Sequence, residues 1–277
     1  MPRLTGDLDG PARELRRLIT PHLLSVAENA NTHQPLGRGE ERIEDDRFVL
    51  WMGTRDHPAW NVVQRLRLSE RDIDDVRAWV HELLGRRGRS ACTWEIGSSA
   101  TPRDLVERLR ERGLVDDDDP DVVAMLLTAP PPPAPAGVEA RPVQSYEEHA
   151  DALRVAGVAF GMQEELRDEA EERARYESAR ERGAGRTFVV LVDGAIAGSG
   201  SSTYAEGAVT LNGGAVLPHA RGRGAYRALV AARWEDAVER GTPALATQAG
   251  RMSAPILTRL GFHEVARIRI LVDRFGA

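Results

Sequence analysis

The stretch from Gly213 to Leu229 holds the residues whose types and spacing point most clearly to chemistry. It reads Gly-Gly-Ala-Val-Leu-Pro-His-Ala-Arg-Gly-Arg-Gly-Ala-Tyr-Arg-Ala-Leu, with a predicted strand ending at Pro218 and a helix following at once. Glycines let the backbone turn so that successive N–H groups point into one concavity, and the helix N-terminus adds partial positive charge. Arg221 and Arg223 add to that positive field. The sequence therefore predicts an anion site suited to a pyrophosphate.

Two other phosphate-binding patterns do not fit this stretch. A Rossmann fingerprint needs a third glycine where Arg227 stands, and it needs a parallel βαβ context. A P-loop needs a lysine, but all 37 basic residues of the chain are arginine. The absence of lysine also excludes Schiff-base chemistry and catalysis through a pyridoxal-phosphate aldimine.

The elements that position this stretch form a regular series in the C-terminal half. The pairs Asp193-Gly194 and Glu206-Gly207 predict hairpin turns, so the strands around them form an antiparallel meander. Hydrophobic periodicity predicts strands at 138–143, 187–192, 195–204, 208–217, 243–248 and 264–273, and helices at 145–160, 163–182, 224–240 and 253–260.

Two motifs in this half carry a family resemblance. The pattern Val-x-Pro-x-x-Arg-Gly-x-Gly from Val216 to Gly224 resembles the acetyl-CoA-binding motif of the GNAT acetyltransferase superfamily. Residues 253–262, Ser-Ala-Pro-Ile-Leu-Thr-Arg-Leu-Gly-Phe, resemble the short helix of that family that ends in Gly-Phe. The resemblance covers residues 138–277, and the order of elements agrees with it. It implies an α/β (α+β) fold, in which a mixed, mostly antiparallel sheet is flanked by helices.

The resemblance also implies a cosubstrate and the residues that bind it. Acetyl-CoA would place its pyrophosphate on the backbone N–H groups of this turn, and no metal is expected. The end of the preceding strand would bond the pantetheine arm, and a backbone N–H there would stabilise the oxyanion of the tetrahedral intermediate. The expected cofactor-binding residues are Val216, Leu217, Arg221, Gly222, Arg223, Gly224, Ala225 and Tyr226.

Two departures from the family pattern leave the catalytic acid and base unassigned. Tyr226 stands where many members have glycine or alanine, and Leu257 stands where many have a tyrosine that protonates the leaving thiolate. Thr210 and Asn212 occupy strand positions where a carboxylate sometimes sits. The candidates that remain are Glu164, Glu165 and Glu206 as bases, a water chain, and Tyr204 as a lining residue of the acceptor pocket; each glutamate also fits a surface charge, and Tyr204 also fits a packing residue.

The proline-rich segment 129–137 reads as a stiff linker that divides the chain into residues 1–128 and 138–277. Arg-Ala-Trp-Val at 77–80 and Ala-Cys-Thr-Trp at 91–94 run parallel to Arg-Ala-Leu-Val at 227–230 and Ala-Leu-Ala-Thr at 244–247. This similarity predicts that the N-terminal half is a degenerate GNAT-like repeat, so that the chain carries two tandem halves. The predicted elements are helices at 12–27, 71–84 and 102–112, strands at 48–52, 61–68, 90–96 and 121–128, a polar loop at 29–46 and a solvated turn at 116–119.

The N-terminal half lacks a phosphate-binding loop of its own. Residues 66–72, between a predicted strand and helix, contain two acids and no glycine, so they would repel a diphosphate. This half would serve as a scaffold or as part of the acceptor cleft. Cys92 falls in a predicted buried strand without a base partner and reads as a core residue.

Composition narrows the remaining classes. The 277 residues are 42% hydrophobic and 29% charged, as in a globular protein, and no apolar run could span a membrane. A net charge of −6 argues against a general nucleic-acid binder, and a single cysteine favours the cytoplasm. The prediction is an N-acetyltransferase that moves acetyl from acetyl-CoA to a primary amine of a small molecule by direct attack. A non-catalytic CoA- or acyl-CoA-binding module and a protein amine acetyltransferase are the alternatives, and both a monomer and a homodimer stay open.

Overall fold

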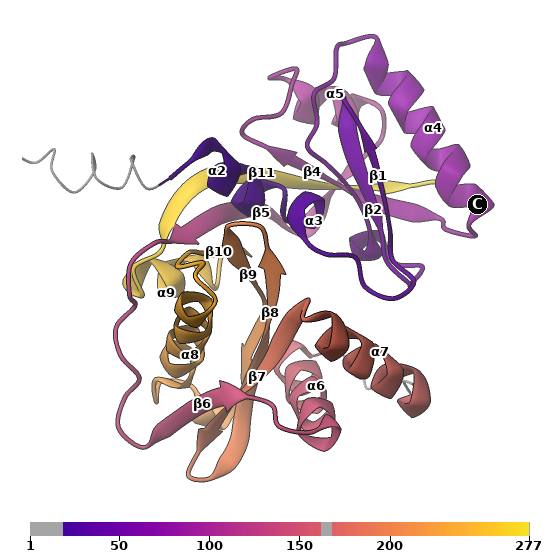
Figure 1. The fold of residues 1–277 in the computed structure, drawn as a ribbon. Coiled ribbons are helices and arrows are strands. Elements are labelled where there is room, and N and C mark those ends of the chain that lie inside the picture. Colours follow the sequence, from indigo (N-terminus) through magenta and orange to yellow (C-terminus); the bar gives the residue numbers. More distant parts are fainter. Residues whose placement is uncertain (1–18, 162–167, 277) are drawn as a thin grey trace, which may run out of the picture.

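All strands of the described residues, 19–161 and 168–276 of the computed structural model, join one sheet of eleven strands (Figure 1). Their order across the sheet is β1-β2-β3-β4-β11-β5-β10-β9-β8-β7-β6. The predicted mixed, mostly antiparallel sheet flanked by helices is therefore confirmed. None of the described helices is long and apolar enough to cross a membrane.

The N-terminal half supplies the first five strands. The bounds of its elements are α2 Pro21–Glu28, α3 Ala30–His33, β1 Glu41–Asp45, β2 Phe48–Met52, the 3₁₀ turn η1 Pro58–Trp60, β3 Asn61–Gln64, α4 Asp72–Arg86, β4 Ala91–Gly97, α5 Leu105–Glu111 and β5 Val115–Leu127.

The C-terminal half follows after residues 128–137, which contain no helix or strand. The bounds of its elements are β6 Val138–Pro142, α6 Tyr146–Phe160, α7 Glu169–Arg182, β7 Gly185–Val192, β8 Ala195–Ala205, β9 Ala208–Val216, the 3₁₀ turn η2 Pro218–Ala220, α8 Ala225–Glu239, β10 Leu245–Ala249, α9 Ala254–Arg259 and β11 His263–Arg274.

The two halves repeat one arrangement. In the first, β3 runs parallel to β4 with α4 between them in the chain; in the second, β9 runs parallel to β10 with α8 between them. Each unit then continues through a short helix, α5 or α9, into a long strand, β5 or β11. The element order predicted from the internal similarity is present.

The long final strand of each half lies in the sheet of the other half. β5 pairs with β10, β11 pairs with β4, and β5 and β11 pair with each other, all antiparallel. Figure 1 shows β11, in yellow, running through the strands of the N-terminal half. Leu271 of β11 is buried in the hydrophobic core of the N-terminal half. The exchanged strand therefore completes the core of the half to which it does not belong in sequence.

A buried carboxylate fixes the exchanged strand. Asp273, near the end of β11, is 1% exposed. It accepts hydrogen bonds from Nε and Nη2 of Arg77, both at 2.8 Å, and its Oδ2 lies 2.8 Å from Nε2 of His81. Both partners lie on α4, so β11 is tied to the main helix of the N-terminal half.

Helices cover both faces of the sheet, and strand periodicity assigns each side chain to a face. On β5, Met125 and Leu127 pack with α8 and α9, whereas Ala124 and Leu126 pack with α2. α4 and α5 cover the same face as α8 and α9 but over the N-terminal strands. α6 lies on the opposite face, where the hydroxyl of Ser199 on β8 donates to the Ala152 carbonyl at 2.8 Å.

Three sequence predictions need correction or fall outside the described residues. The segment predicted as a polar loop contains β1. This strand lies at the edge of the sheet and pairs only with β2 among the described strands, so it carries polar side chains and has no hydrophobic pattern typical of a strand. Residues 116–119 are part of β5 and not a turn; Asp116 is held there by Arg110 and Arg269. The beginnings of the predicted helices at 12–27 and 163–182 lie outside the described residues.

Candidate functional site

β9 and β10 are neighbours only at their beginnings. Their parallel register joins Leu245 to Val209 and Ala246 to Thr210, and the Thr247 hydroxyl then donates to the Leu211 carbonyl at 3.2 Å. Further along, β8 is the only strand of the described residues that pairs with β9. The second half of β9 therefore has one free edge, facing away from β8.

A bulge bends β9 where it leaves β10. The β8–β9 register shifts between Ser199 and Ser201, opposite Gly213 and Gly214. Gly213 has a φ of +58°, a left-handed conformation that glycine adopts without strain. The bulge therefore changes the direction of β9 after it leaves β10.

The loop from Pro218 to Gly224 presents unpaired backbone donors. Gly222 and Gly224 have φ values of +75° and +81°, which fold the chain tightly before α8 starts at Ala225. Among the described residues, none accepts a hydrogen bond from the N–H groups of residues 222–226. These donors and the helix dipole together are suited to an anion. The residues present therefore fit a diphosphate.

Gly224 is required for a second reason. A Cβ at this position would lie 2.6 Å from Cγ of Pro135, so the proline-rich segment packs directly on the loop. A Cβ at Gly222 would meet nothing within 4 Å. Position 222 is therefore restricted by backbone conformation alone, whereas position 224 is restricted by conformation and by contact.

The two arginines of the loop differ in their partners. Arg223 makes two hydrogen bonds to Asp193 in the β7–β8 hairpin, at 2.7 and 3.0 Å, and it lowers the pKa of that carboxyl. Arg221 donates through Nε to the Val216 carbonyl at 3.2 Å and pairs with no carboxylate of the described residues. Arg221 therefore supplies positive charge beside the loop that no carboxylate of the described residues neutralises. The charge of Arg223 is largely neutralised by Asp193, so Arg223 adds less to the positive potential of the loop.

Tyr226 turns its side chain toward β9, while its N–H stays in the loop. A Cβ at Gly214 would lie 2.8 Å from Cε2 of Tyr226, so the absence of a side chain there makes room for the ring. Beneath it lies Arg233 of α8, which is 1% exposed. Burial lowers the pKa of Arg233, and the neighbouring Tyr226 hydroxyl opposes that shift. The sequence predicted neither this contact nor the buried arginine; the glycines at 200 and 214 were its available signal.

Two further cofactor candidates lie at the end of β9. The N–H of Leu217 donates to the Ala197 carbonyl at 2.8 Å, so this donor is engaged with β8. Val216 is partly exposed and pairs with Gly198. The structure brings all eight predicted cofactor-binding residues into one continuous strand end, loop and helix start.

The catalytic candidates do not gather around that loop. The Tyr204 hydroxyl donates to Oδ2 of Asp236 at 2.7 Å, on the face covered by α8. Burial and Asp236 raise the pKa of Tyr204. Glu206 is exposed at the β8–β9 hairpin, and its carbonyl lies 2.7 Å from Nε2 of His22. Glu164 and Glu165 lie outside the described residues.

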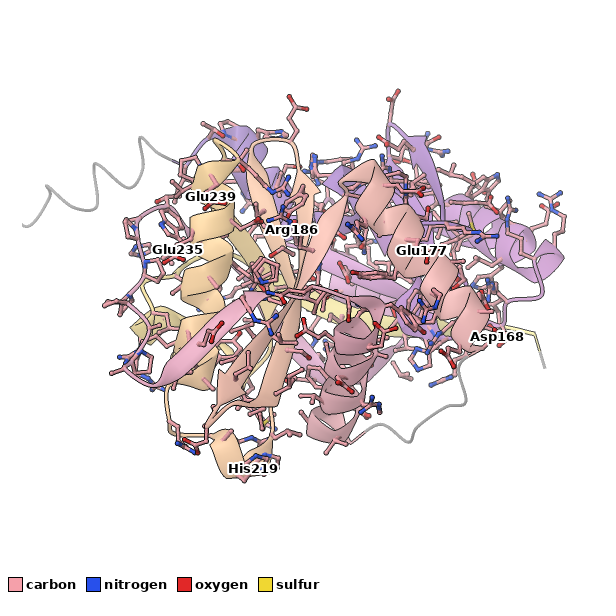
Figure 2. The ribbon with its side chains drawn as sticks, turned by 60° about the horizontal axis from the view of Figure 1, so that its bottom comes forward. Asp168, Glu177, Arg186, His219, Glu235 and Glu239 are labelled. Atoms are coloured by element: carbon pink, nitrogen blue, oxygen red, sulfur yellow. The ribbon has the colours of Figure 1, made fainter. Side chains whose placement is uncertain are left out.

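Three other residues singled out in the sequence have clear positions. His219 is exposed in η2 at an end of the molecule beside the loop (Figure 2). Leu257 is buried in α9 and packs in the core shared with α8. Cys92 is fully buried on β4, and burial raises the pKa of its thiol. The described part of the chain contains no group of three His, Cys, Asp or Glu side chains able to hold a metal ion.

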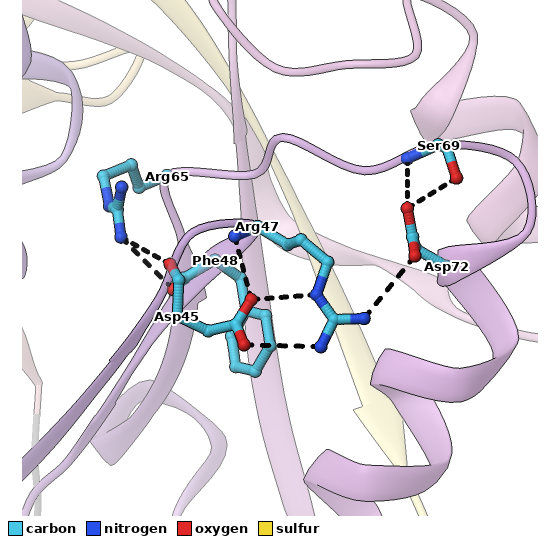
Figure 3. Close-up of polar contacts among 6 residues, drawn as sticks. All are labelled: Asp45, Arg47, Phe48, Arg65, Ser69 and Asp72. Atoms are coloured by element: carbon cyan, nitrogen blue, oxygen red, sulfur yellow. Dashed lines mark hydrogen bonds and ion pairs between the residues drawn. The ribbon is translucent and has the colours of Figure 1, made fainter.

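The equivalent loop of the N-terminal half is closed by its own hydrogen bonds (Figure 3). Asp72 accepts from the N–H of Ser69 at 2.8 Å and from its hydroxyl at 2.5 Å, and Arg47 joins Asp72 to Asp45. The N–H groups of Arg67 and Leu68 donate to backbone carbonyls. The N–H groups of residues 67–69 are therefore engaged within the N-terminal half.

Comparison with known proteins identifies the class of the C-terminal half. Residues 146–262 match the family model described as the acetyltransferase (GNAT) family. This segment begins with α6 and ends just before β11, and it includes the whole loop from Pro218 to Gly224. Residues 146–262 therefore form a GNAT acetyltransferase domain within the C-terminal half. No curated protein matches the sequence.

Solved structures extend the likeness over most of the chain. A GCN5-related N-acetyltransferase from Kribbella flavida is 21% identical, with a TM-score of 0.69 over 91% of this chain and 96% of that one. A tandem GNAT protein from the clavulanic acid biosynthesis pathway is 17% identical, with a TM-score of 0.61 over 92% and 94%. A GCN5-related N-acetyltransferase from Sphaerobacter thermophilus is 19% identical, with a TM-score of 0.62 over 84% and 82%. At these identities the likeness is one of fold, and the fold is that of two tandem GNAT-like halves.

Proposed function

We propose that the C-terminal half binds acetyl-CoA and transfers its acetyl group to a primary amine of a small molecule by direct attack. The observation that carries this proposal is the row of unpaired N–H groups at residues 222–226, placed where β9 has left β10. The family of the domain supports acetyl transfer, and the open strand edge supports binding of an extended arm beside it. A single cysteine favours the cytoplasm as the setting.

In this proposal each part of the loop has a separate task. The N–H groups of residues 222–226 and the guanidinium of Arg221 bind the diphosphate. The free edge of β9 near Val216 binds and orients the pantetheine arm. Bound acetyl-CoA supplies an activated thioester. Cys92 cannot serve as an acyl carrier because it is buried in the other half with a raised pKa, which is consistent with direct attack.

Calorimetry with acetyl-CoA tests the cofactor site. We expect one site per chain, and we expect Gly222→Val to weaken binding at least about tenfold because valine resists the left-handed backbone. The matched control is Gly241→Val, which has a φ of +74° and open space around it but lies at the other end of α8. Equal affinities in all three proteins would contradict the site.

Turnover against a panel of small primary amines tests the activity. A second function, a non-catalytic CoA- or acyl-CoA-binding module, is favoured by two observations: Leu257 is buried where many relatives place a proton-donating tyrosine, and the Tyr204 hydroxyl is engaged by Asp236. Binding without product from any small amine or from peptide amino groups would support the module. Product from peptides alone would indicate a protein amine acetyltransferase.

A further inference from the structure

The sheet face opposite α4 and α8 carries a row of polar side chains near the junction of the halves. We call Gln64, Glu95, Gln248 and Asn212 the inter-half face. The β3–β4 register joins Val63 to Trp94, and continuing it by one residue brings Gln64 beside Glu95. The β4–β11 register places Ile270 opposite Glu95. Gln248 follows on β10, on the same face. The exchange of β5 and β11 thus places polar groups from both halves on one surface.

Glu95 is a carboxylate that forms no ion pair with an arginine or histidine of the described residues. Its Oε2 is buried and accepts no hydrogen bond from the described residues, although the residue as a whole is partly exposed. Burial raises its pKa to about 7, and hydrogen bonding by the Gln248 side chain partly opposes this shift. Many acidic side chains of this chain pair with arginine, so a carboxylate left without one on an interior face calls for a ligand.

Gln64 provides an independent sign of a missing ligand. It is 0% exposed, and both its Nε2 and its Oε1 lack a partner among the described residues. Buried amide groups are normally hydrogen-bonded because their desolvation is otherwise uncompensated. Beside Glu95, the pair offers two acceptors and one donor. A primary ammonium satisfies the acceptors, and a neighbouring hydroxyl satisfies the donor.

The internal repeat shows how the two halves differ on this face. Extending the alignment of residues 91–94 with 244–247 by one position makes Glu95 the counterpart of Gln248. The strand registers then make Gln64 the counterpart of Asn212. The C-terminal half therefore has only neutral amides at these positions, and the N-terminal half contributes the carboxylate.

We propose that the inter-half face binds a small amino alcohol, with Glu95 as the counter-ion of its ammonium and Gln64 as the partner of its hydroxyl. That this ligand is the acyl acceptor rests on the proposed function. The N-terminal half then supplies part of the acceptor site, and it does so without binding a cofactor of its own.

Other charged groups near this face have their own partners. Glu28 of α2 accepts from the N–H of Ser99 at 2.8 Å. His33 of α3 lies 2.8 Å from the Ser25 hydroxyl, and burial and then His22 lower its pKa. Arg65 donates to the Asp45 carbonyl at 2.6 Å. None of these side chains neutralises Glu95 in the described structure. The electrostatic attraction of an ammonium ligand to this face would therefore come from Glu95.

Binding of 2-amino-1,3-propanediol to the full chain, compared with glycerol, tests the proposal. The two probes differ only in an ammonium or a hydroxyl at the central carbon. By NMR titration at pH 8 we expect the amine to bind at least about tenfold more tightly than glycerol. The preference should disappear near pH 5, because Glu95 then becomes protonated while the probe keeps its charge. This wild-type comparison does not depend on whether a variant folds.

A variant pair completes the test. Glu95→Gln should bind both probes equally, whereas the control Glu235→Gln, on the exposed side of α8, should keep the preference. No binding of the amine, or a preference that survives Glu95→Gln or pH 5, would overturn the proposal. Calorimetry with acetyl-CoA on the same samples separates this proposal from the proposed function. If the protein prefers the amine over glycerol but does not bind acetyl-CoA, only the proposed function is refuted.

Discussion

Replacing Asp273 by asparagine should destabilise the whole protein because this side chain fixes the exchanged strand β11 on α4. The carboxylate is 1% exposed and meets Arg77 and His81 through three contacts of 2.8 Å. Asparagine keeps the volume but removes the charge that compensates the Arg77 guanidinium. Breaking a buried pair from one side costs about 3–5 kcal/mol. Because the Arg77 side chain is 23% exposed, we expect the lower part of that range or slightly less, about 2–3 kcal/mol.

Urea unfolding followed by tryptophan fluorescence measures this loss. The matched control is Asp121→Asn, which breaks another aspartate–arginine pair, to Arg269 of β11, whose carboxylate is 83% exposed. We expect the control to lose less than about 1 kcal/mol, as exposed pairs do. A loss for Asp273→Asn no larger than that of the control would refute the view that this carboxylate secures the strand exchange.

Three further predictions concern the loop and α6. Gly222→Val and Gly224→Val should each weaken acetyl-CoA binding at least about tenfold, or about 1.4 kcal/mol, by calorimetry; unchanged affinity in both would remove the cofactor assignment. Intact protein should bind one acetyl-CoA per chain, and two equivalent sites would contradict this. Arg141 lowers the pKa of Glu148 from 4.5 to about 2. The contribution of the ionised Glu148 to the free energy of unfolding is therefore complete above pH 4.5 and is lost toward pH 2. Glu148→Gln should therefore lower stability by about 1 kcal/mol at pH 7 and by less at pH 2, measured by chemical unfolding.

Local signals in the sequence were sufficient for the geometry of the loop that precedes α8. The glycines at 222 and 224 and the helix that follows them act within a few residues, so their geometry follows from residue types. The Asp193-Gly194 hairpin is predictable for the same reason, and both residues have positive φ in the structure. The exchange of β5 and β11 was not predictable in this way. Their alternating side chains suit any neighbouring strand, and the choice of partner depends on contacts far apart in the chain.

Two contacts that the sequence did not reveal, those of Glu95 and Tyr226, share this dependence on register. Glu95 reads as one acidic residue within a predicted strand, and only pairing with its neighbours places it beside Gln64. Tyr226 stands where many GNAT members have glycine or alanine, and the space above Gly214 takes its ring. Such contacts depend on which residue of a neighbouring strand lies next to the side chain. A pattern of residues close together in the sequence does not predict that neighbour.

The strand exchange also sets an order of events on the ribosome. β4 ends at Gly97, but its neighbour β11 begins only at His263. At about 5–20 residues per second, the nascent N-terminal half waits on the order of ten seconds or more with an unpaired edge on β4. Open edges of this kind recruit strands from other chains. The newly made protein therefore passes through an aggregation-prone interval that ends only when the C-terminal half has emerged and delivered β11.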